Sequence, residues 1–203
     1  VWIGWATGEG GRRKPTTALS LACALVDQSR GERHVLVADA DVRGDANDWW
    51  YRAAELDDPL PFDVLVANRF TVAVPPSDPD TWVLVDTPPS QSDLIAAAVD
   101  ASTLVVLVST PGGLDLDGRW ETSQASDGPR SVRLTQVRAN PVGLGRAERY
   151  LAERGLARLD AMIPFRESIR RSSESGRLPN ASGYGLVAHE LIEAFAGLEQ
   201  GRM

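Results

Sequence analysis

The chain has 203 residues, of which 43% are hydrophobic and 24% charged, and these proportions indicate one compact domain rather than a disordered tail or a fibrous repeat. Its single cysteine, Cys23, stands in an apolar run, which excludes a disulfide framework or a cysteine-based zinc or iron–sulfur site within one chain. No apolar stretch approaches the roughly 20 residues of a membrane span, and residues 1–5 lack the features of a signal peptide. We therefore expect a cytoplasmic protein without membrane contact.

The charge is unevenly distributed along the chain. The net charge is −7, which taken alone disfavours a nucleic-acid partner. Residues 130–177, however, hold eleven arginines against five acids, so this segment is basic and the remainder strongly acidic. Among all 21 cationic residues only one is a lysine, Lys14.

Short apolar runs alternate with helical patterns over the whole chain. The expected strands cover residues 2–6, 35–38, 63–66, 82–85, 103–108, 132–137 and 158–163. The expected helices cover residues 16–28, 45–54, 93–99, 145–154, 167–175 and 186–198. Runs that are apolar at nearly every position suit parallel strands covered on both faces. The pattern predicts an α/β fold in which residues 1–203 form a single domain around a doubly wound, mostly parallel sheet.

A glycine-rich turn follows the first expected strand. Residues 7–17 read TGEGGRRKPTT, and such a strand-to-helix turn can wrap its N–H groups around a phosphate, with a lysine beside the terminal phosphates. The strict G-x-x-x-x-G-K-[ST] pattern is not met, so an ordinary loop whose glycines serve only tight turning is the alternative.

Carboxylates end two further expected strands. Asp39 and Asp41 follow the second strand, and Asp86 ends the run at 82–85. Ligands of parallel α/β sheets bind at the carboxyl ends of the strands, and paired carboxylates there suit a Mg²⁺–phosphate site. Helix capping or solvation of the strand ends is the simpler alternative for each residue alone.

Three segments together resemble the ParA/MinD family of partition ATPases. The turn at 8–17 resembles the family's deviant Walker A loop, residues 39–49 (DADVRGDANDW) its second acidic motif, and residues 83–89 (VLVDTPP) its Walker B motif. The segment from Ile163 to Gly176 is similar to the part after the family's last strand. The resemblance spans nearly the whole chain and implies a P-loop NTPase fold of the SIMIBI type. The length implies a small plasmid-type member without an N-terminal DNA-binding domain.

The resemblance implies roles for individual residues, with ATP or ADP and Mg²⁺ as cofactors. Lys14 and Asp39 would be catalytic, Lys14 on the β- and γ-phosphates and Asp39 beside the attacking water. Asp86, Asp39 and Thr16 would lie at the metal. The nucleotide would be contacted by residues of the loop, of the following helix and of the segment after the last strand: Gly8, Gly10, Gly11, Arg12, Arg13, Lys14, Thr16, Thr17 and Pro164.

Three residues of the loop depart from the family pattern. Glu9 replaces the signature lysine and would repel a triphosphate. Arg13 replaces the last glycine, and Pro15 replaces the Mg²⁺-binding Ser/Thr and has neither a hydroxyl nor an N–H group. Arg12 and Arg13 would compensate by gripping phosphate, and Thr16 by reaching Mg²⁺. We expect ATP hydrolysis to be weak or absent.

The late basic segment is the candidate DNA surface. The resemblance implies a homodimer that binds DNA without sequence preference, associates with the nucleoid and is stimulated by a centromere-binding, ParB-type protein. The candidate DNA contacts are Arg149, Arg154, Arg166, Arg170 and Arg171. A solvated helix face is the alternative for these arginines.

Two further functions compete with a partition ATPase. The first is a pseudo-ATPase of the same fold that binds DNA or a partner protein without efficient hydrolysis. The second is a relative of the nitrogenase-type iron protein, which the lone Cys23 disfavours because such a protein needs cluster cysteines.

Overall fold

The computed structural model describes residues 1–6, 13–30, 32–74, 76–78, 80–88, 91–111, 130–137, 141–178 and 182–200. Its strands are β1 (Trp2–Ala6), β2 (Val35–Asp39), β3 (Asp63–Val66), β4 (Trp82–Asp86), β5 (Leu104–Ser109), β6 (Arg130–Leu134) and β7 (Ala157–Arg158). Its helices are α1 (Arg13–Gln28), α2 (Asp45–Glu55), α3 (Ser92–Ala101), α5 (Pro141–Glu153), α6 (Glu167–Ser175) and α7 (Tyr184–Gln200).

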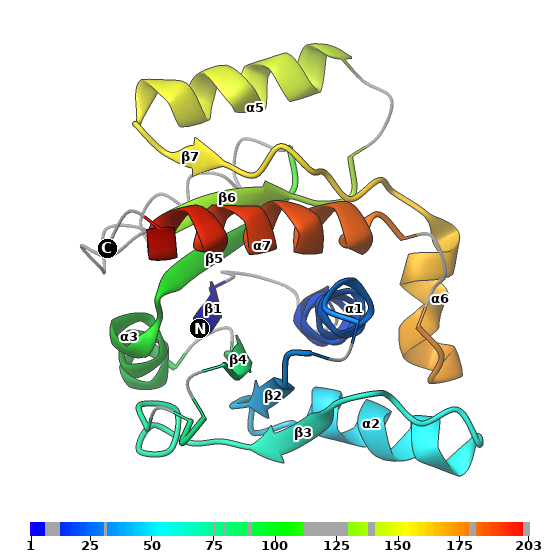
Figure 1. Ribbon diagram of the computed structural model, residues 1–203. Helices are drawn as coiled ribbons and strands as arrows, with labels where there is room; N and C mark the ends of the chain where they lie inside the picture. The colour runs from blue at the N-terminus through cyan, green and yellow to red at the C-terminus, as the bar shows by residue number, and fades with distance from the viewer. Residues whose placement is uncertain are drawn as a thin grey trace.

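Within these ranges the strands form one parallel sheet in the order β3-β2-β4-β1-β5-β6-β7. The first strand therefore lies at the centre, between β4 and β5. The chain first adds strands on one side of β1 and later on the other, which is the doubly wound arrangement predicted from the sequence (Figure 1). The carboxyl ends of β2, β4 and β1 consequently lie next to one another at one edge of the sheet.

Helices cover both faces of the sheet. On one face α1, α2 and α7 bury Leu21, Trp49 and Leu191 in a common core. On the other face α3 and α5 bury Ala98 and Leu151, and Figure 1 shows α1 and α3 on opposite sides of β4. This two-sided cover explains the continuous apolar runs. A buried aliphatic side chain contributes about 1.5–3 kcal/mol to the free energy of folding on either face of the sheet.

The last two strands differ from the prediction. The strand expected at 132–137 is β6, Arg130–Leu134, so it begins and ends earlier. The expected strand at 158–163 is reduced to Ala157–Arg158. The Glu190 carboxylate of α7 accepts hydrogen bonds from the backbone N–H groups of Asp160 (2.7 Å) and Ala161 (2.9 Å). These N–H groups bind a side chain instead of a neighbouring strand. Backbone pairing resumes at Ile163, whose N–H group donates to the Leu134 carbonyl oxygen at 3.0 Å, and continues at the bridge between Val137 and Pro164.

The turn after α6 is tied to α2. Trp49 Nε1 donates a hydrogen bond of 2.8 Å to the Gly176 carbonyl oxygen, and Gly176 ends α6 with a φ of +73°. A Cβ at this position would lie 2.9 Å from Arg52 Cδ. The turn therefore requires glycine both for its backbone conformation and for the close approach of α2.

Gly176→Ala is expected to lower the free energy of unfolding by about 2 kcal/mol, roughly half from the left-handed backbone and half from the contact with Arg52. Gly155→Ala is the matched control, because Gly155 has a φ of +64° and nothing within 4 Å of an added Cβ; it is expected to lose only about 1 kcal/mol. Urea unfolding of both variants measures the difference, and equal losses would exclude a contribution from the contact.

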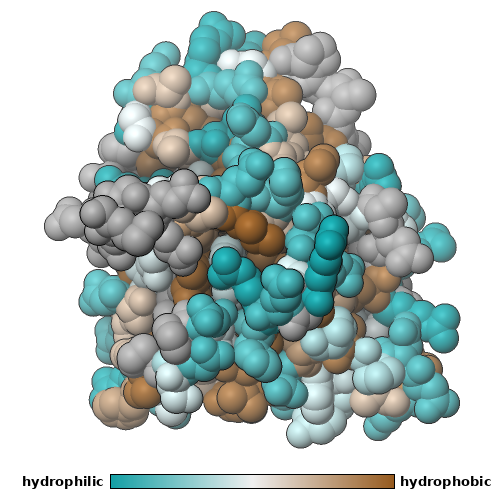
Figure 2. Space-filling view, in the orientation of Figure 1, coloured by the Kyte–Doolittle hydropathy of each residue, from teal (hydrophilic) through white to brown (hydrophobic). Residues whose placement is uncertain are grey.

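The face shown in Figure 2 carries many hydrophilic residues with separate apolar areas between them. Among the described residues, no helix combines the length and the apolar character that crossing a membrane would require. The single cysteine lies half-buried on α1, and burial, followed by the charges of Asp27 and Asp58, raises the pKa of its thiol to about 12. Cys23 is thus a protonated side chain of the core at neutral pH.

Candidate functional site

The two predicted acidic strand ends lie side by side. β2 and β4 are neighbours, and their register pairs Asp39 with Asp86. The backbone pairing of the two strands extends one residue beyond β2, because the Ala40 N–H group donates to the Asp86 carbonyl oxygen at 2.9 Å. Each of the two acids is only 1% exposed. The sheet therefore brings together two buried carboxylates at the edge where β1 leads into α1.

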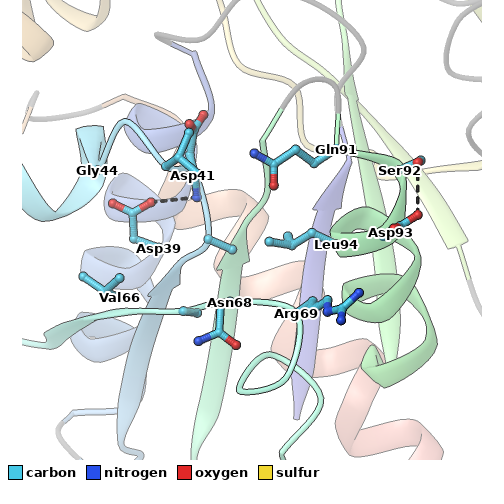
Figure 3. Close-up of a pocket in the computed structure, with 13 residues that line it drawn as sticks. Asp39, Asp41, Gly44, Val66, Asn68, Arg69, Gln91, Ser92, Asp93 and Leu94 are labelled. Atoms are coloured by element: carbon cyan, nitrogen blue, oxygen red, sulfur yellow. Dashed lines mark hydrogen bonds between the residues drawn. The ribbon is translucent and has the colours of Figure 1, made fainter.

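Asp39 is held by the backbone of the loop that follows it. Its carboxylate accepts hydrogen bonds from the N–H groups of Asp41 (3.2 Å) and Asn47 (3.0 Å), and Figure 3 shows the first of these bonds. Burial raises the pKa of the Asp39 carboxyl, and these N–H groups partly oppose the rise. Asp39 thereby fixes the shape of the β2–α2 loop, because it bonds to both the start of the loop and the first turn of α2.

Asp41 is paired with a cation of its own loop. Arg43 Nη2 lies 3.0 Å from Asp41 Oδ2 and 3.7 Å from Asp45 Oδ2. The hydrogen bond to Asp41, with the charges of Asp41, Asp45 and Asp86, raises the pKa of the Arg43 guanidinium. About half of the Arg43 side chain remains exposed. Arg43 is thus a positive charge close to the acidic strand ends.

A cavity of about 650 Å³ opens beside these acids. It lies between the β2–α2 loop, the turn after β3 and the first residues of α3 (Figure 3). Its walls combine Asp39 and Asp41 with Arg69, Gln91 and the apolar side chain of Leu94. Of the residues predicted to lie at the metal, Asp39 lines this cavity.

The predicted phosphate loop is covered by the structure only in part. Gly8, Gly10, Gly11 and Arg12, as well as Glu9, lie outside the described residues. Arg13 and Lys14 begin α1, but their side chains also lie outside the description. The roles assigned to these residues stay predictions.

The described start of α1 is buried. Pro15 lies in the first turn, as its fixed φ favours, and Thr16 and Thr17 are both buried. The Thr17 hydroxyl lies within hydrogen-bond distance, 3.0 Å, of the Tyr184 hydroxyl on α7. Tyr184 belongs to none of the motifs, so this contact between α1 and α7 could not be predicted from the sequence.

Pro164 lies in a second cavity, of about 1060 Å³, between α1, the start of α7 and the segment after β7. The same cavity is lined by Val137, Met162, Arg166 and Tyr184. Pro164 was predicted to contact the nucleotide, and this role stays a prediction.

The five candidate DNA contacts fall into two groups. Arg149 lies on α5, donating to the Gly145 carbonyl oxygen at 3.2 Å, and the Arg154 guanidinium stacks 3.6 Å from the centroid of the Tyr150 ring. The second group belongs to α6: exposed Arg166 is its N-cap, and the side chain of Arg170 lies outside the description. Arg171 is exposed and forms an ion pair of 3.2 Å with Glu167. Figure 1 shows α5 and α6 on different parts of the molecule.

The raised pKa of Asp39 predicts a pH dependence of stability. The folded protein binds this proton more tightly than the unfolded chain does, so the carboxyl contributes stability that is complete below its usual pKa of 3.8 and lost as pH rises through its folded pKa. The free energy of unfolding of wild type minus that of Asp39→Asn should therefore decrease over this range. Urea unfolding without nucleotide or Mg²⁺ measures it, and a difference that is constant or increases with pH would contradict the shift.

Comparison with known proteins gives one curated relative and many similar folds. No family model matches the chain. The maintenance of carboxysome distribution protein A of Gloeobacter kilaueensis is 35% identical over 177 residues, which cover 83% of this chain and 79% of the relative. A plasmid partition protein of Borrelia burgdorferi B31 bound to AMPPNP superposes with a TM-score of 0.70 at 16% identity, over 96% of this chain and 98% of that one. The MinD cell division protein of Aquifex aeolicus gives a TM-score of 0.71 at 18% identity, over 94% and 96%.

Proposed function

The chain belongs to the ParA/MinD family of partition and positioning ATPases, and from this we propose that it is a nucleotide-linked switch that positions a cargo. In this proposal the ATP-bound protein is a homodimer that binds DNA without sequence preference, and a partner protein releases it. The cargo is a plasmid, a chromosome or, as the name of the 35% identical relative suggests, a protein assembly.

The observation that carries the proposal is the pairing of Asp39 and Asp86 at the carboxyl ends of adjacent strands, beside the start of α1. Within the described ranges no three His, Cys, Asp or Glu side chains form a metal site of their own. Mg²⁺ in nucleotide sites takes one or two protein carboxylates and completes its shell with phosphate oxygens and water. The donor set present, two buried carboxylates and the buried Thr16, fits that pattern.

Each of these residues has a role in the proposal. Asp86 would hold Mg²⁺ through water, and Asp39 would orient the water near the terminal phosphate, its position fixed by the Asp41 and Asn47 N–H groups. Mg²⁺, when bound, neutralises charge on the β- and γ-phosphates. Arg43 would adjust the charge of the loop, because its guanidinium lies close to three of the acids.

A pseudo-ATPase is the second candidate, favoured by the observed start of α1. Pro15 occupies the first turn without a hydroxyl, and the Thr17 hydroxyl is shared with Tyr184. Thr16, the other hydroxyl residue of this turn, is buried. This arrangement favours nucleotide binding with slow turnover.

Light scattering combined with a phosphate-release assay tests the function and separates the two candidates. We expect the mass of a monomer without nucleotide or with ADP, and the mass of a dimer with Mg²⁺ and ATP. Phosphate release by the dimer identifies an ATPase, and a dimer without release identifies the pseudo-ATPase. A mass that does not respond to ATP would overturn the switch in both forms.

A further inference from the structure

β3 forms one end of the sheet and leaves a backbone edge open. Among the described residues it pairs with β2 alone. The register sets Asp39 opposite Val66, and the Ala67 N–H group donates to the Asp39 carbonyl oxygen at 2.7 Å. Because successive residues of a strand direct their backbone groups to opposite sides, those of Val64 and Val66 point away from β2.

Exposed apolar side chains accompany this edge. Leu65 is 55% exposed and Val66 75% exposed. The turn that follows adds Phe70 at 70% and Val74 at 61%. Figure 2 shows brown, apolar surface at the lower side of the molecule, where Figure 1 places β3 and this turn. Several large apolar side chains exposed within ten residues of an open strand edge are typical of an interaction surface.

The surroundings of the edge are acidic. Between residues 55 and 70 there are four acids and one arginine, namely Glu55, Asp57, Asp58, Asp63 and Arg69. All four acids are exposed. The guanidinium of Arg69 lies 4.5 Å from the centroid of the Phe70 ring, so the exposed ring already accepts a cation over its face. A partner for this surface therefore needs apolar and positively charged side chains.

We infer that the open edge of β3 docks an extended segment of a partner protein in which apolar residues alternate with arginine or lysine. The segment adds a strand to the sheet: its backbone bonds to Val64 and Val66, its apolar side chains cover Leu65 and Phe70, and its cations face the acids. The new strand is separated by β3 from β2, the strand that ends at Asp39. The inference concerns a surface outside the nucleotide site and does not depend on nucleotide binding.

Fluorescence anisotropy without nucleotide tests this inference. The probe is a labelled peptide of alternating arginine and valine, compared with the same peptide carrying glutamate in place of arginine. A third peptide has N-methyl groups at alternate residues, on the backbone side that would pair with β3. The protein variants are Val66→Pro, which removes one outward N–H group, and Val66→Ala, which keeps it. Val142→Ala is the matched control, because Val142 is 63% exposed on α5.

We expect the arginine peptide to bind wild type and Val142→Ala equally, and to bind Val66→Pro at least about tenfold more weakly than Val66→Ala. The N-methylated and glutamate peptides should also bind at least about tenfold more weakly to wild type. Equal binding of the arginine and glutamate peptides, or of the methylated and unmethylated peptides, would overturn the inference. So would a homodimer, seen by light scattering without peptide, that Val66→Pro dissociates, because the occupant would then be a second copy. None of these outcomes alters the response of the protein to ATP.

Discussion

Replacing Lys14 by alanine is expected to raise the Kd for MgATP by about tenfold to a hundredfold. The reason is that a lysine at the start of α1 would form charge-assisted hydrogen bonds with the terminal phosphates, and such bonds contribute about 1.5–3 kcal/mol each. Isothermal titration of ATP in Mg²⁺ measures the change. ADP affinity should fall less than ATP affinity, because ADP lacks the γ-phosphate that Lys14 would also contact.

Two comparisons make the Lys14 result specific. Arg146→Ala removes a cation from the exposed surface of α5 and should leave the Kd unchanged, which controls for net charge. Thermal unfolding without nucleotide shows whether Lys14→Ala is folded. Equal ATP affinity of folded Lys14→Ala and wild type would remove Lys14 from the nucleotide site.

The second large effect is expected on DNA binding. Reversing two charges with Arg170→Glu and Arg171→Glu should raise the Kd for duplex DNA of arbitrary sequence at least about tenfold at moderate salt. Each lost phosphate contact should also reduce the slope of log K against log salt by about 0.9. Anisotropy titrations at several salt concentrations, with ATP present, measure both quantities.

A second double variant distinguishes the effect of where the charges lie from the effect of net charge. Arg30→Glu with Arg69→Glu changes the net charge equally but alters exposed residues of the acidic part of the chain. We expect this pair to weaken DNA binding only slightly. Equal losses in both pairs, or binding that ignores salt, would contradict a DNA surface on α6.

Much of the fold could be predicted from the sequence, for physical reasons visible in β4. Val83 and Val85 face α3, whereas Trp82 and Leu84 face α1 and α7, so the strand reads as a continuous apolar run. The ladder at 158–163 was harder to predict. It ends early because Glu190, some thirty positions later, binds two of its N–H groups, and no local pattern reports a contact of that separation.

The candidate site was predictable in the same uneven way. Asp39 and Asp86 could be predicted to lie together, because both end apolar runs and the carboxyl ends of parallel strands meet at one edge of the sheet. The partners that position these residues were missed. Asn47 binds Asp39 with its backbone N–H group, which any residue except proline would offer, so the residue type gives no indication of the contact. Tyr184 reaches Thr17 only because α7 packs on α1.

Isothermal titration of the wild-type protein with ATP, ADP and a non-hydrolysable ATP analogue in Mg²⁺ decides whether this ParA/MinD-family chain is a nucleotide-linked switch. We expect saturable binding of all three nucleotides with dissociation constants below the millimolar range, despite Glu9, Arg13 and Pro15 in the loop. Absence of binding at millimolar nucleotide would contradict it and leave the paired carboxylates Asp39 and Asp86 without the ligand assigned to them.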